Sequence, residues 1–346
     1  MKKREEIITI DESKLWINPI ATADVFFNEN IWVNKLLIVD HKNNLRWLIT
    51  AKDIDNITRE SQSSIKPSRD KQHRLRVGAT LHMFRTPEGQ LDKKRILQYV
   101  DELVEKWIDV VAVSSAHWHT ESIGEMVQLV RKSQPTLTII AWNVTSAEGV
   151  EFLKNKWADT IKIGQWPWSI CTTREVAGVG IPQMTALYVC SQAAKIVGAK
   201  IIADGWISKS GDIVKALTLA DAIMAGGIFA WAQESPWEIF EFKGEQFKVY
   251  RGMWSHEAMK DGSAARYGHT KDKVRKLTSE GIVGMKPIAW PISDIIKEYR
   301  GWVQSGMWYL WAKDLKSLRK NARYIKMTPA GQKESAPHDI TQLKKS

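Results

Sequence analysis

From about residue 75 onward, six short and almost continuously apolar runs alternate with stretches of helical periodicity. The runs are LRVGATL (75–81), IDVVAVSSA (108–116), TLTIIAWNV (136–144), ADTIKIG (158–164), AKIIADG (199–205) and DAIMAGG (221–227). Their β-branched, unbroken apolar character is typical of parallel strands that are covered on both faces. Strand, helix and strand at this spacing predict an α/β fold built from βαβ units.

The intervening stretches carry the apolar stripe of amphipathic helices that pack against such a sheet. The clearest stripes are Ile96, Leu97, Val100, Leu103 and Val104 in KKRILQYVDELVEKW, and Ile123, Met126, Val127 and Val130 in ESIGEMVQLVRKS. A closed barrel of this class needs eight strands, and six are visible. Either the sheet is open, or the chain lacks the first two strands of a barrel.

The first 60 residues have a different organisation. KLLIVDHKNNLRWLITAKDI (35–54) predicts a strand, a turn at Asn43–Asn44, a second strand and the start of a helix. The polar segment NITRESQSSIKPSRDKQH follows and predicts a linker, which puts a domain boundary near residues 55–74. The front piece is then a small α/β fragment, too short to hold a core unaided.

Beyond the sixth run, residues 228–290 form a long stretch that reads as irregular. A loop of this length inside a compact domain is usually functional, often as a lid. The chain then ends with a predicted helix (DLKSLRKN), a short predicted strand (ARYIKMT) and a polar tail.

Composition narrows the class of protein. In 346 residues, 44% are apolar, which supplies a sizeable core. No apolar run reaches the roughly 18 residues of a membrane span, and the start MKKREEIITIDESK lacks the apolar stretch of a secretory signal. Two cysteines give no disulfide framework, so a reduced, cytoplasmic protein is expected. The net charge of +11 allows either a nucleic-acid partner or a basic surface for anionic small substrates. The charge is spread along the chain without a DNA- or RNA-binding motif, which favours the second.

The segment IKIGQWPWSICTTREVAGVGIPQ (161–183) is the most informative for chemistry. A strand ends at Gly164, an irregular loop carries Cys171, and a helix follows from about Pro182. Barrel enzymes hold their active sites on loops at the C-terminal ends of strands. Ser169, Thr172, Thr173 and Arg174 flank the cysteine with donors and a cation that favour thiolate. From position alone, Cys171 is either a nucleophile or a buried structural cysteine, whereas Cys190, in an apolar helix, is expected in the core.

Glycines follow the last two predicted strands. Asp204 and Gly205 end one of them, and Gly226 and Gly227 end the next. If the six strands are the last six of a barrel, these are strands 7 and 8, where the fold commonly binds phosphate through exposed backbone N–H groups. His117 and His119, by contrast, lack a third ligand at diagnostic spacing, so a metal there is not favoured.

At these residues the sequence resembles a known family. SICTTREVAGVGIPQ, IIADGWISKSGDIVKAL, YRGMWSHEAM and SGMWYLWA are similar to IMP dehydrogenase, with GMP reductase as its nearest relative, and the resemblance runs from about residue 30 to 340. It implies a (β/α)8 TIM barrel with a pair of CBS modules inserted after the second strand and helix. The predicted domains are a partial CBS module (1–58), a linker (59–74), and a barrel (75–346) with strands 3–8, a flap at about 250–288 and a C-terminal tail. The chain then lacks the first two barrel strands, in agreement with the six runs.

The resemblance implies a reaction in guanine nucleotide synthesis. Cys171 attacks C2 of IMP, hydride passes to NAD, and the covalent intermediate is hydrolysed to XMP. Arg266 and Tyr267 match the Arg–Tyr pair of the family's mobile flap, where the arginine is the base that activates water. From the residues alone, Arg266 would read as a solvated arginine in a lid. Thr173 and Glu280 match residues linked to water activation and base contact.

The other expected site residues come from the same resemblance. Positions that bind IMP are matched by Ser169, Asp204, Gly205, Trp206, Gly226, Gly227, Tyr250, Gly252 and Met253. NAD is expected against Ser114, Ser115 and Asn143. A monovalent cation, K⁺, is expected at Gly164, Trp166 and Cys171. Glu334 resembles a neighbouring subunit's contribution to the cation site in a homotetramer.

Two departures from the family pattern stand out. Ser114 occupies the place of an aspartate that holds the cofactor ribose, which puts cofactor affinity or choice in question. The chain also has 17 tryptophans, and fifteen stand where the family has glycine. These are Trp47, Trp107, Trp118, Trp142, Trp157, Trp166, Trp168, Trp206, Trp231, Trp237, Trp254, Trp290, Trp302, Trp308 and Trp311, whereas Trp16 and Trp32 do not align.

Glycine at such positions supplies positive φ or close backbone approach, whereas tryptophan carries about 150–250 Å² of side chain. Two indoles in QWPWSIC would fill the space for IMP and the cation, and Trp206 would collide with phosphate. One hypothesis is that UGA, decoded here as tryptophan, is translated as glycine in the source cell. The alternative is a truly tryptophan-rich chain without activity.

Three functions follow from these observations. The leading one is an IMP dehydrogenase that uses NAD and a monovalent cation. GMP reductase, which deaminates GMP to IMP with NADPH, is the rival within the family; the flap Arg–Tyr pair and the CBS remnant favour the dehydrogenase, and Gly227 leans toward the reductase. A non-catalytic nucleotide-sensing fragment is the third, motivated by the short front and by Ser114.

Overall fold

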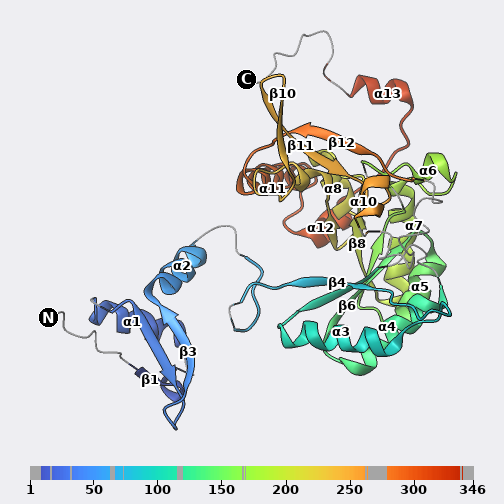
Figure 1. The fold of residues 1–346 in the computed structure, drawn as a ribbon. Helices are drawn as coiled ribbons and strands as arrows, with labels where there is room; N and C mark the ends of the chain where they lie inside the picture. Colours follow the sequence, from blue (N-terminus) through green and yellow to red (C-terminus); the bar gives the residue numbers. More distant parts are fainter. Residues whose placement is uncertain are drawn as a thin grey trace. The chain divides into compact units, whose positions relative to one another are not determined.

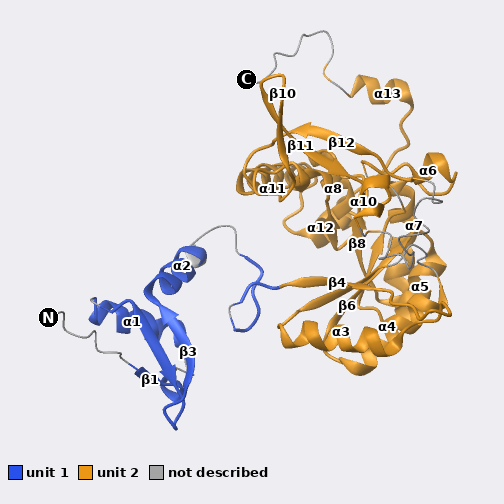
Figure 2. Ribbon diagram, in the orientation of Figure 1, with its two compact units in different colours: residues 1–76 blue, residues 77–346 orange. Residues whose placement is uncertain are grey.

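A computed structural model describes residues 9–15, 18–31, 33–62, 67–72, 74–114, 120–165, 167, 169–261, 263, 279–335 and 337. The chain folds into two compact units, residues 1–76 and 77–346 (Figure 2). Within the described residues, no helix is long and apolar enough to cross a membrane.

The first unit is a three-stranded sheet with two helices. Its elements are β1 (Thr9–Asp11), a 3-10 turn (Glu12–Leu15), α1 (Pro19–Glu29), β2 (Lys35–Val39), β3 (Leu45–Thr50) and α2 (Ala51–Gln62). β2 lies between β1, which is parallel to it, and β3, which is antiparallel. The expected strand–turn–strand–helix order at 35–54 is confirmed, and α2 runs on to Gln62, into the stretch expected to be a linker. A small apolar cluster holds the unit together: Ala23, Phe27, Leu36, Ile38 and Ile54.

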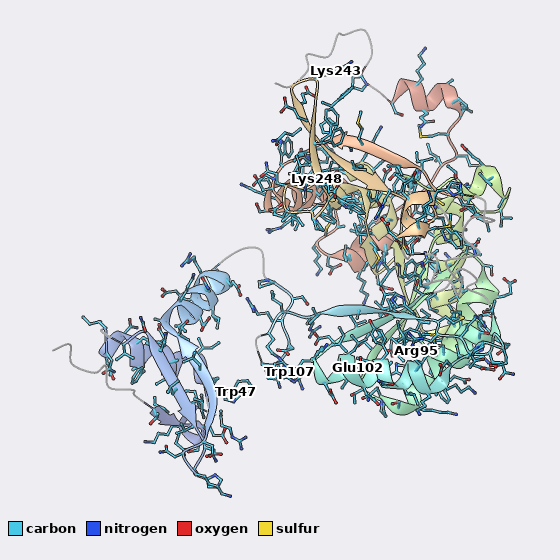
Figure 3. All side chains as sticks on the ribbon, viewed as in Figure 1. Trp47, Arg95, Glu102, Trp107, Lys243 and Lys248 are labelled. Atoms are coloured by element: carbon cyan, nitrogen blue, oxygen red, sulfur yellow. The ribbon has the colours of Figure 1, made fainter. Side chains whose placement is uncertain are left out.

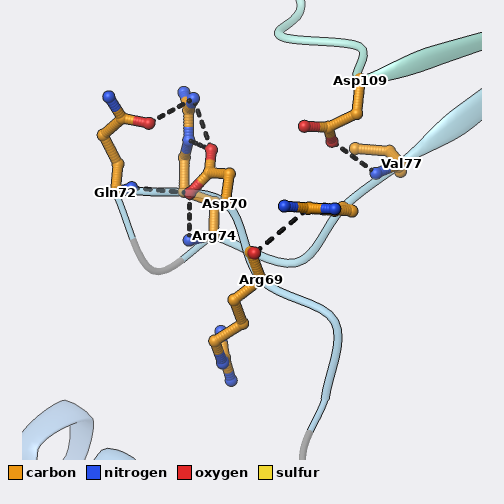
Figure 4. A network of polar contacts seen from close by, with 7 residues as sticks. Arg69, Asp70, Gln72, Arg74, Val77 and Asp109 are labelled. Carbon is orange, nitrogen blue, oxygen red and sulfur yellow. Dashed lines mark hydrogen bonds and ion pairs between the residues drawn. The ribbon is translucent and has the colours of Figure 1, made fainter. Parts of the chain in front are cut away.

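Hydrogen bonds around Asp70 and Arg74 form a turn near the end of the first unit (Figure 4). The carboxylate of Asp70 accepts hydrogen bonds from the backbone N–H groups of Gln72 and Arg74, both at 2.9 Å, and from the Arg74 guanidinium. In the second unit, Asp109 accepts from the backbone N–H of Val77 at 2.8 Å, which fixes the chain just before the first strand of the main sheet.

The second unit contains a six-stranded parallel sheet in which each strand pairs with the next one along the chain (Figure 1). The strands are β4 (Gly78–His82), β5 (Val110–Ser114), β6 (Thr138–Val144), β7 (Thr160–Ile163), β8 (Lys200–Asp204) and β9 (Ala222–Met224). All six predicted strands are therefore confirmed, each within a few residues. Sequential order is the winding of a β/α barrel, whereas a doubly wound sheet reverses order at a switch point. The sheet is thus the curled, TIM-barrel-like α/β fold that the alternation predicts.

Helices connect the strands and cover the sheet. They are α3 (Lys93–Glu105), α4 (Glu121–Ser133), α5 (Ala147–Asn155), α6 (Thr173–Val176), α7 (Gln183–Val197), α8 (Ser210–Leu217) and α9 (Gly227–Ala230). The predicted stripes of α3 and α4 face the core, where Ile96, Val100, Ile123, Met126 and Val130 are fully buried. Cys190, on α7, lies in the same core as expected, and burial raises the pKa of its thiol to about 12.

The stretch 228–290, expected to be irregular, holds an antiparallel sheet. β10 (Ile239–Phe242), β11 (Glu245–Arg251) and β12 (Val283–Pro287) pair in that order, and α10 (His256–Lys260) follows β11. The prediction was wrong here because the hairpin is short and its turn, Lys243–Gly244, interrupts the alternation. Both turn residues have positive φ, which is the geometry of a tight hairpin turn.

The C-terminal part consists of α11 (Ile292–Tyr309), α12 (Leu315–Asn321) and α13 (Pro329–Glu334). The helix predicted at DLKSLRKN is confirmed, but the strand predicted at 322–328 is wrong. A strand needs a neighbouring backbone to pair with, and this segment instead places the Tyr324 hydroxyl on the side chain of Thr218. Thr328 and Pro329 then begin α13, as an N-cap followed by proline at the first helical position.

Several tryptophans occupy backbone conformations that favour glycine. Among the described residues, six non-glycine residues have φ between +51° and +72°, and four of them are Trp107, Trp157, Trp206 and Trp311. Trp47 and Trp107 expose more than half of their surface (Figure 3). A large side chain in the left-handed region costs about 1–2 kcal/mol, so the four positions with positive φ are strained as tryptophan.

Three of these tryptophans end helices in the same way. After α3, the N–H of Trp107 bonds to the carbonyl of Val104 at 2.9 Å and the N–H of Ile108 to that of Leu103 at 3.2 Å. Trp157 after α5 and Trp311 after α11 repeat this pair of bonds. The arrangement is the Schellman motif, whose left-handed residue is usually glycine.

Candidate functional site

The loop after β7 carries Cys171 and is clamped by a segment more than 100 residues away. Cys171 forms an antiparallel bridge with Gly281. The N–H of Thr172 donates to the carbonyl of Glu280, and the N–H of Ile282 donates to that of Ile170, both at 3.0 Å. The backbone on both sides of the cysteine is therefore fixed.

Cys171 begins a short chain of hydrogen bonds. Its thiol donates to the hydroxyl of Thr173 at 3.3 Å, and that hydroxyl donates to a carboxylate oxygen of Glu280 at 2.7 Å. Thr173 is buried at the start of α6. The structure thus brings together three residues expected in catalysis, in an order that can pass a proton from sulfur to carboxylate.

The electrostatics of the thiol differ from the expectation. The flanking residues were predicted to favour thiolate, but the pKa of Cys171 is raised above its ordinary value. Burial is the main cause and the negative charge of Glu280 adds to it, while hydrogen bonds from Thr173 and the charge of Arg174 act the other way. The cysteine is therefore held as a thiol beside an acceptor for its proton.

A cavity of about 510 Å³ opens near this loop. Six residues expected to bind the substrate line it: Ser169, Gly205, Trp206, Gly226, Gly227 and Tyr250. Ser169 comes from the Cys171 loop, the glycines from the ends of β8 and β9, and Tyr250 from β11. Four separate segments therefore converge on one pocket.

The glycines of this pocket lie close to polar side chains. A Cβ atom on Gly227 would lie 3.4 Å from the Ser169 hydroxyl, and one on Gly226 would lie 3.5 Å from the Tyr250 hydroxyl. The loop after β8 is held by the N–H of Trp206, which donates to the carbonyl of Pro167 at 3.0 Å. Hydroxyl groups beside glycine backbone form a polar recess suited to an oxyanion.

Other lining residues were not foreseen from the sequence. Trp231 and Trp290 lie beside the recess, and Lys286, Glu298 and Tyr299 extend the cavity toward β12 and α11. They lie in the part of the chain taken as irregular, or on a helix without a distinctive motif. The one available signal for a strand in this part of the chain was the alternation in EQFKVYR, which puts Tyr250 and Lys248 on one face of β11.

Three expected binding residues lie outside the lining of this cavity: Asp204, Gly252 and Met253. Gly252 packs against the Cys171 loop, where a Cβ atom would lie 3.1 Å from the carbonyl oxygen of Ile170. Its N–H donates to the carbonyl of Ile282 at 3.0 Å. Met253 follows it and is half-buried. Gly252 therefore supports the loop rather than the recess.

Asp204, at the end of β8, lies in a buried polar cluster. One of its carboxylate oxygens accepts from the ammonium of Lys162 at 3.0 Å and from the side-chain amide of Asn143 at 2.9 Å. The same amide donates to the carbonyl of Gly164 at 2.6 Å. The ammonium also lies 3.8 Å from the centre of the Trp142 ring. The ends of β6, β7 and β8 are thereby tied together.

The expected cofactor residues show two buried polar atoms without a hydrogen-bond partner among the described residues. These are the hydroxyl of Ser114, at the end of β5, and the amide oxygen of Asn143, at the end of β6. Such atoms need a partner, and the hydroxyl groups of a ribose would supply one. Ser115 lies outside the described residues.

The expected cation residues and flap residues are only partly described. The carbonyl of Gly164 accepts from Asn143, and Glu334 is exposed at the end of α13. Trp166, Arg266, Tyr267, His117 and His119 lie outside the described residues. Within the described part of the chain, no group of three or more His, Cys, Asp and Glu side chains is arranged to hold a metal ion.

Comparison with known proteins agrees with this architecture. Residues 36–338 match the family described as IMP dehydrogenase / GMP reductase domain. The chain is 42% identical over 315 residues to inosine-5'-monophosphate dehydrogenase of Bacillus subtilis, covering 91% of this chain and 62% of that protein. It is 39% identical over 339 residues to the enzyme of the same name from Chlorobaculum parvum, covering 97% of this chain and 65% of that protein. The chain therefore spans less than two thirds of the length of these relatives.

A solved structure is also similar. It is the crystal structure of a cysteine-to-alanine variant of GMP reductase from Trypanosoma brucei in complex with guanosine 5'-monophosphate. The TM-score is 0.81 at 31% sequence identity, and the match covers 93% of this chain and 63% of that one. With the family match over most of its length and a shared fold, this chain belongs to the IMP dehydrogenase / GMP reductase family.

Proposed function

We propose that this protein oxidises IMP to XMP with NAD, using Cys171 as the nucleophile. The observation that carries the proposal is the hydrogen-bonded chain from Cys171 through Thr173 to Glu280, beside a recess built from Ser169, Gly227 and other polar or glycine residues. The relatives in Bacillus and Chlorobaculum, which are named for this activity, support it.

The recess would hold the phosphate of the nucleotide. Backbone N–H groups at Gly226 and Gly227 and the hydroxyls of Ser169 and Tyr250 are donors of the kind that phosphate oxygens accept. Asp204, held in place by Lys162 and Asn143, would accept hydrogen bonds from ribose hydroxyls. This set recognises a nucleoside monophosphate by both its charge and its sugar.

The sulfur of Cys171 would form a bond to C2 of the purine. The thiol must first lose its proton, and Thr173 and Glu280 give that proton a route to a carboxylate. NAD, when bound, accepts the hydride that leaves C2. Water then adds to C2 of the cysteine adduct, the C–S bond breaks, and XMP and the thiol are released. By family resemblance, Arg266 is the base for that water and Tyr267 its neighbour.

The fit of the chain to NAD rests on the hydroxyl of Ser114 and the amide oxygen of Asn143. Both atoms are buried and have no hydrogen-bond partner among the described residues, so each needs one. A serine hydroxyl can engage one ribose hydroxyl, but it cannot bind two of them as a carboxylate does. We therefore expect NAD to bind more weakly than in relatives that have aspartate at this position.

Other parts of the proposal rest on resemblance alone. These are a monovalent cation at Gly164, Trp166 and Cys171, a contribution from Glu334 of a neighbouring subunit in a tetramer, a cytoplasmic location, and a partial CBS module at residues 1–58. That the six strands are part of a barrel with two further strands also rests on resemblance alone. The measured oligomeric mass and the dependence of rate on K⁺ would test the first two.

Activity with the two rival substrates decides the reaction. The purified 346-residue chain, and the same chain with glycine at the fifteen family-glycine positions, would be mixed with IMP and NAD, and NADH formation followed. A covalent adduct on Cys171, seen by intact mass and absent in Cys171→Ser, is the expected result. Oxidation of NADPH with GMP and release of ammonia would instead identify a GMP reductase. The similarity to the Trypanosoma structure and the presence of Gly227 are the reasons for testing this rival. Nucleotide binding without either turnover would favour the sensing fragment.

A further inference from the structure

Lys248, in the middle of β11, has a completely buried side chain. Its ammonium donates to three backbone carbonyls: those of Ala232 at 2.7 Å, Gln233 at 2.9 Å and Ser235 at 2.6 Å. Among the described residues, no ion pair with a carboxylate involves it. A buried ammonium costs several kcal/mol unless its donors are used, and here each of the three N–H groups has an acceptor.

The three carbonyls belong to one turn, residues 231–235, which directly follows α9. Carbonyl oxygens that converge on one positive charge are the usual way for a protein to hold a monovalent cation. Here the cation is part of the chain itself. Without it, the part-buried carbonyls of Gln233 and Ser235 would lose this hydrogen bond, and the buried carbonyl of Ala232 would keep only the N–H of Ser235 at 3.1 Å.

The same strand contacts the turn a second time. Tyr250 lies two residues beyond Lys248 and therefore on the same face of β11. Its ring packs edge-to-face against Trp231, with the ring centres 5.0 Å apart. Both Trp231 and Tyr250 line the cavity, as does Gly227 at the start of α9. The position of the turn thus determines the position of Trp231 and Tyr250, which form one wall of the cavity.

Contacts from the opposite side complete the clamp. The N–H of Ala289 donates to the carbonyl of Trp231 at 2.7 Å, and the Glu234 carboxylate accepts from the N–H of Ile292 at 2.9 Å. These bonds tie the turn to the start of α11, whereas Lys248 ties it to the sheet. Of these contacts, only the ammonium of Lys248 forms hydrogen bonds with several backbone groups at once.

We propose that Lys248 is a positioning residue whose ammonium acts as a built-in monovalent cation, holding the 231–235 turn and with it the wall of the nucleotide recess. The part that concerns nucleotide rests on the proposed function. Lys248 touches neither the recess nor Cys171, so its loss should weaken nucleotide binding more than the chemical step.

The first test needs no nucleotide. In the full chain, Lys248→Met removes the donors but keeps the apolar stem. Hydrogen exchange at the amides of residues 230–235 should become at least about ten-fold faster, while exchange in α3 and α4 stays as it was. Lys243→Met is the matched control, because Lys243 is an exposed lysine in the turn of the same hairpin (Figure 3). Unchanged exchange in the turn, or a uniform rise through the whole chain, would overturn the proposal whether or not the protein oxidises IMP.

The second test uses the proposed reaction. Lys248→Met should raise KM for IMP about ten-fold with kcat changed less than about three-fold. Lys248→Ala should recover a low KM when propylammonium is added, but not with tetramethylammonium at the same ionic strength, because only the former can donate to the carbonyls. Equal loss of kcat and no rescue would contradict a positioning role. If the parent chain itself shows no IMP oxidation, the proposed function fails and the exchange experiment still decides the role of Lys248.

Discussion

The ammonium of Lys162 lies 3.0 Å from a carboxylate oxygen of Asp204, and both side chains are more than nine-tenths buried. The two residues sit on adjacent strands, β7 and β8, whose registers pair Lys162 with Ile202. An ion pair this deep holds the end of β8 and the start of the glycine loop in one position. It links the core of the sheet to the recess that Gly205 lines.

Removing either member of this pair alone should be costly, and the costs of removing the two should not add. Lys162→Met leaves a buried carboxylate without its counter-charge, which costs about 3–5 kcal/mol of unfolding free energy. Combining it with Asp204→Asn should cost clearly less than the sum of the two single changes. Urea unfolding of the four proteins gives the coupling energy. As a control, Lys156→Met breaks the exposed pair with Glu121 and should cost no more than about 1 kcal/mol. Additive effects within the Lys162 pair would contradict the assignment.

The raised pKa of Cys171 predicts how its reactivity depends on pH. Only the thiolate reacts with iodoacetamide, so alkylation should be slow at neutral pH and rise through an inflection above the ordinary cysteine value. Glu280→Gln removes a negative charge that disfavours thiolate, so the inflection should move to lower pH. Turnover should fall in the same variant, because the proton acceptor is lost. Peptide mapping separates Cys171 from the buried Cys190. An inflection that moves upward in Glu280→Gln would show that Glu280 does not act on the thiol as a charge.

The β/α part of the fold was predictable because its signals are local. Unbroken β-branched runs identify parallel strands covered on both faces, and stripes such as that of α4 identify their helices. The antiparallel sheet was missed because Lys248 and Tyr250 sit on a half-exposed strand with mixed composition. The predicted strand at 322–328 was wrong because β-forming residues such as Tyr324 and Ile325 pair only if a neighbouring strand is available.

The candidate site, like the fold, was predictable from the sequence only in part. Cys171 and the glycine loops could be placed by their position after strands, and family resemblance added Glu280, 109 residues further along the chain. No periodicity could show that Thr173 links the two, since that contact depends on how the 279–282 segment crosses the Cys171 loop. The raised pKa of the thiol was also beyond the sequence, which shows neighbours but not burial.

Gly164 should tolerate no side chain, and its neighbourhood explains why. It has φ of +142°, and a Cβ atom there would lie 2.3 Å from the carbonyl oxygen of Asp204. Gly164→Ala should therefore lower the unfolding free energy by about 3 kcal/mol or more, from strain and overpacking together. Gly198→Ala is the control, because Gly198 has φ of +65° with open space around it and should cost about 1 kcal/mol. Thermal unfolding would compare them, and equal costs would mean that the close approach to Asp204 is relieved.

The tryptophans at helix ends allow the glycine hypothesis to be tested without any reference to function. Trp107, Trp157 and Trp311 occupy the left-handed residue of Schellman motifs, whereas α7 ends with Gly198, a glycine in the left-handed conformation. Replacing each of the three with glycine should raise stability by about 1 kcal/mol, since strain is removed and little buried surface is lost. Trp231→Gly, at a residue with φ of −97° and a buried ring, should instead destabilise.

The same comparison bears on what the source cell makes. If glycine is the natural residue, peptides of the native protein that span positions 107, 157, 206 and 311 should each have the mass calculated with glycine at that position. In addition, Trp206→Gly should open the recess to nucleotide. Trp206 is the critical case because it combines φ of +62° with a place in the cavity lining. Tryptophan masses at these positions in the native protein, together with stability losses on glycine substitution, would show that tryptophan is the natural residue and that the strain is a real property of this chain.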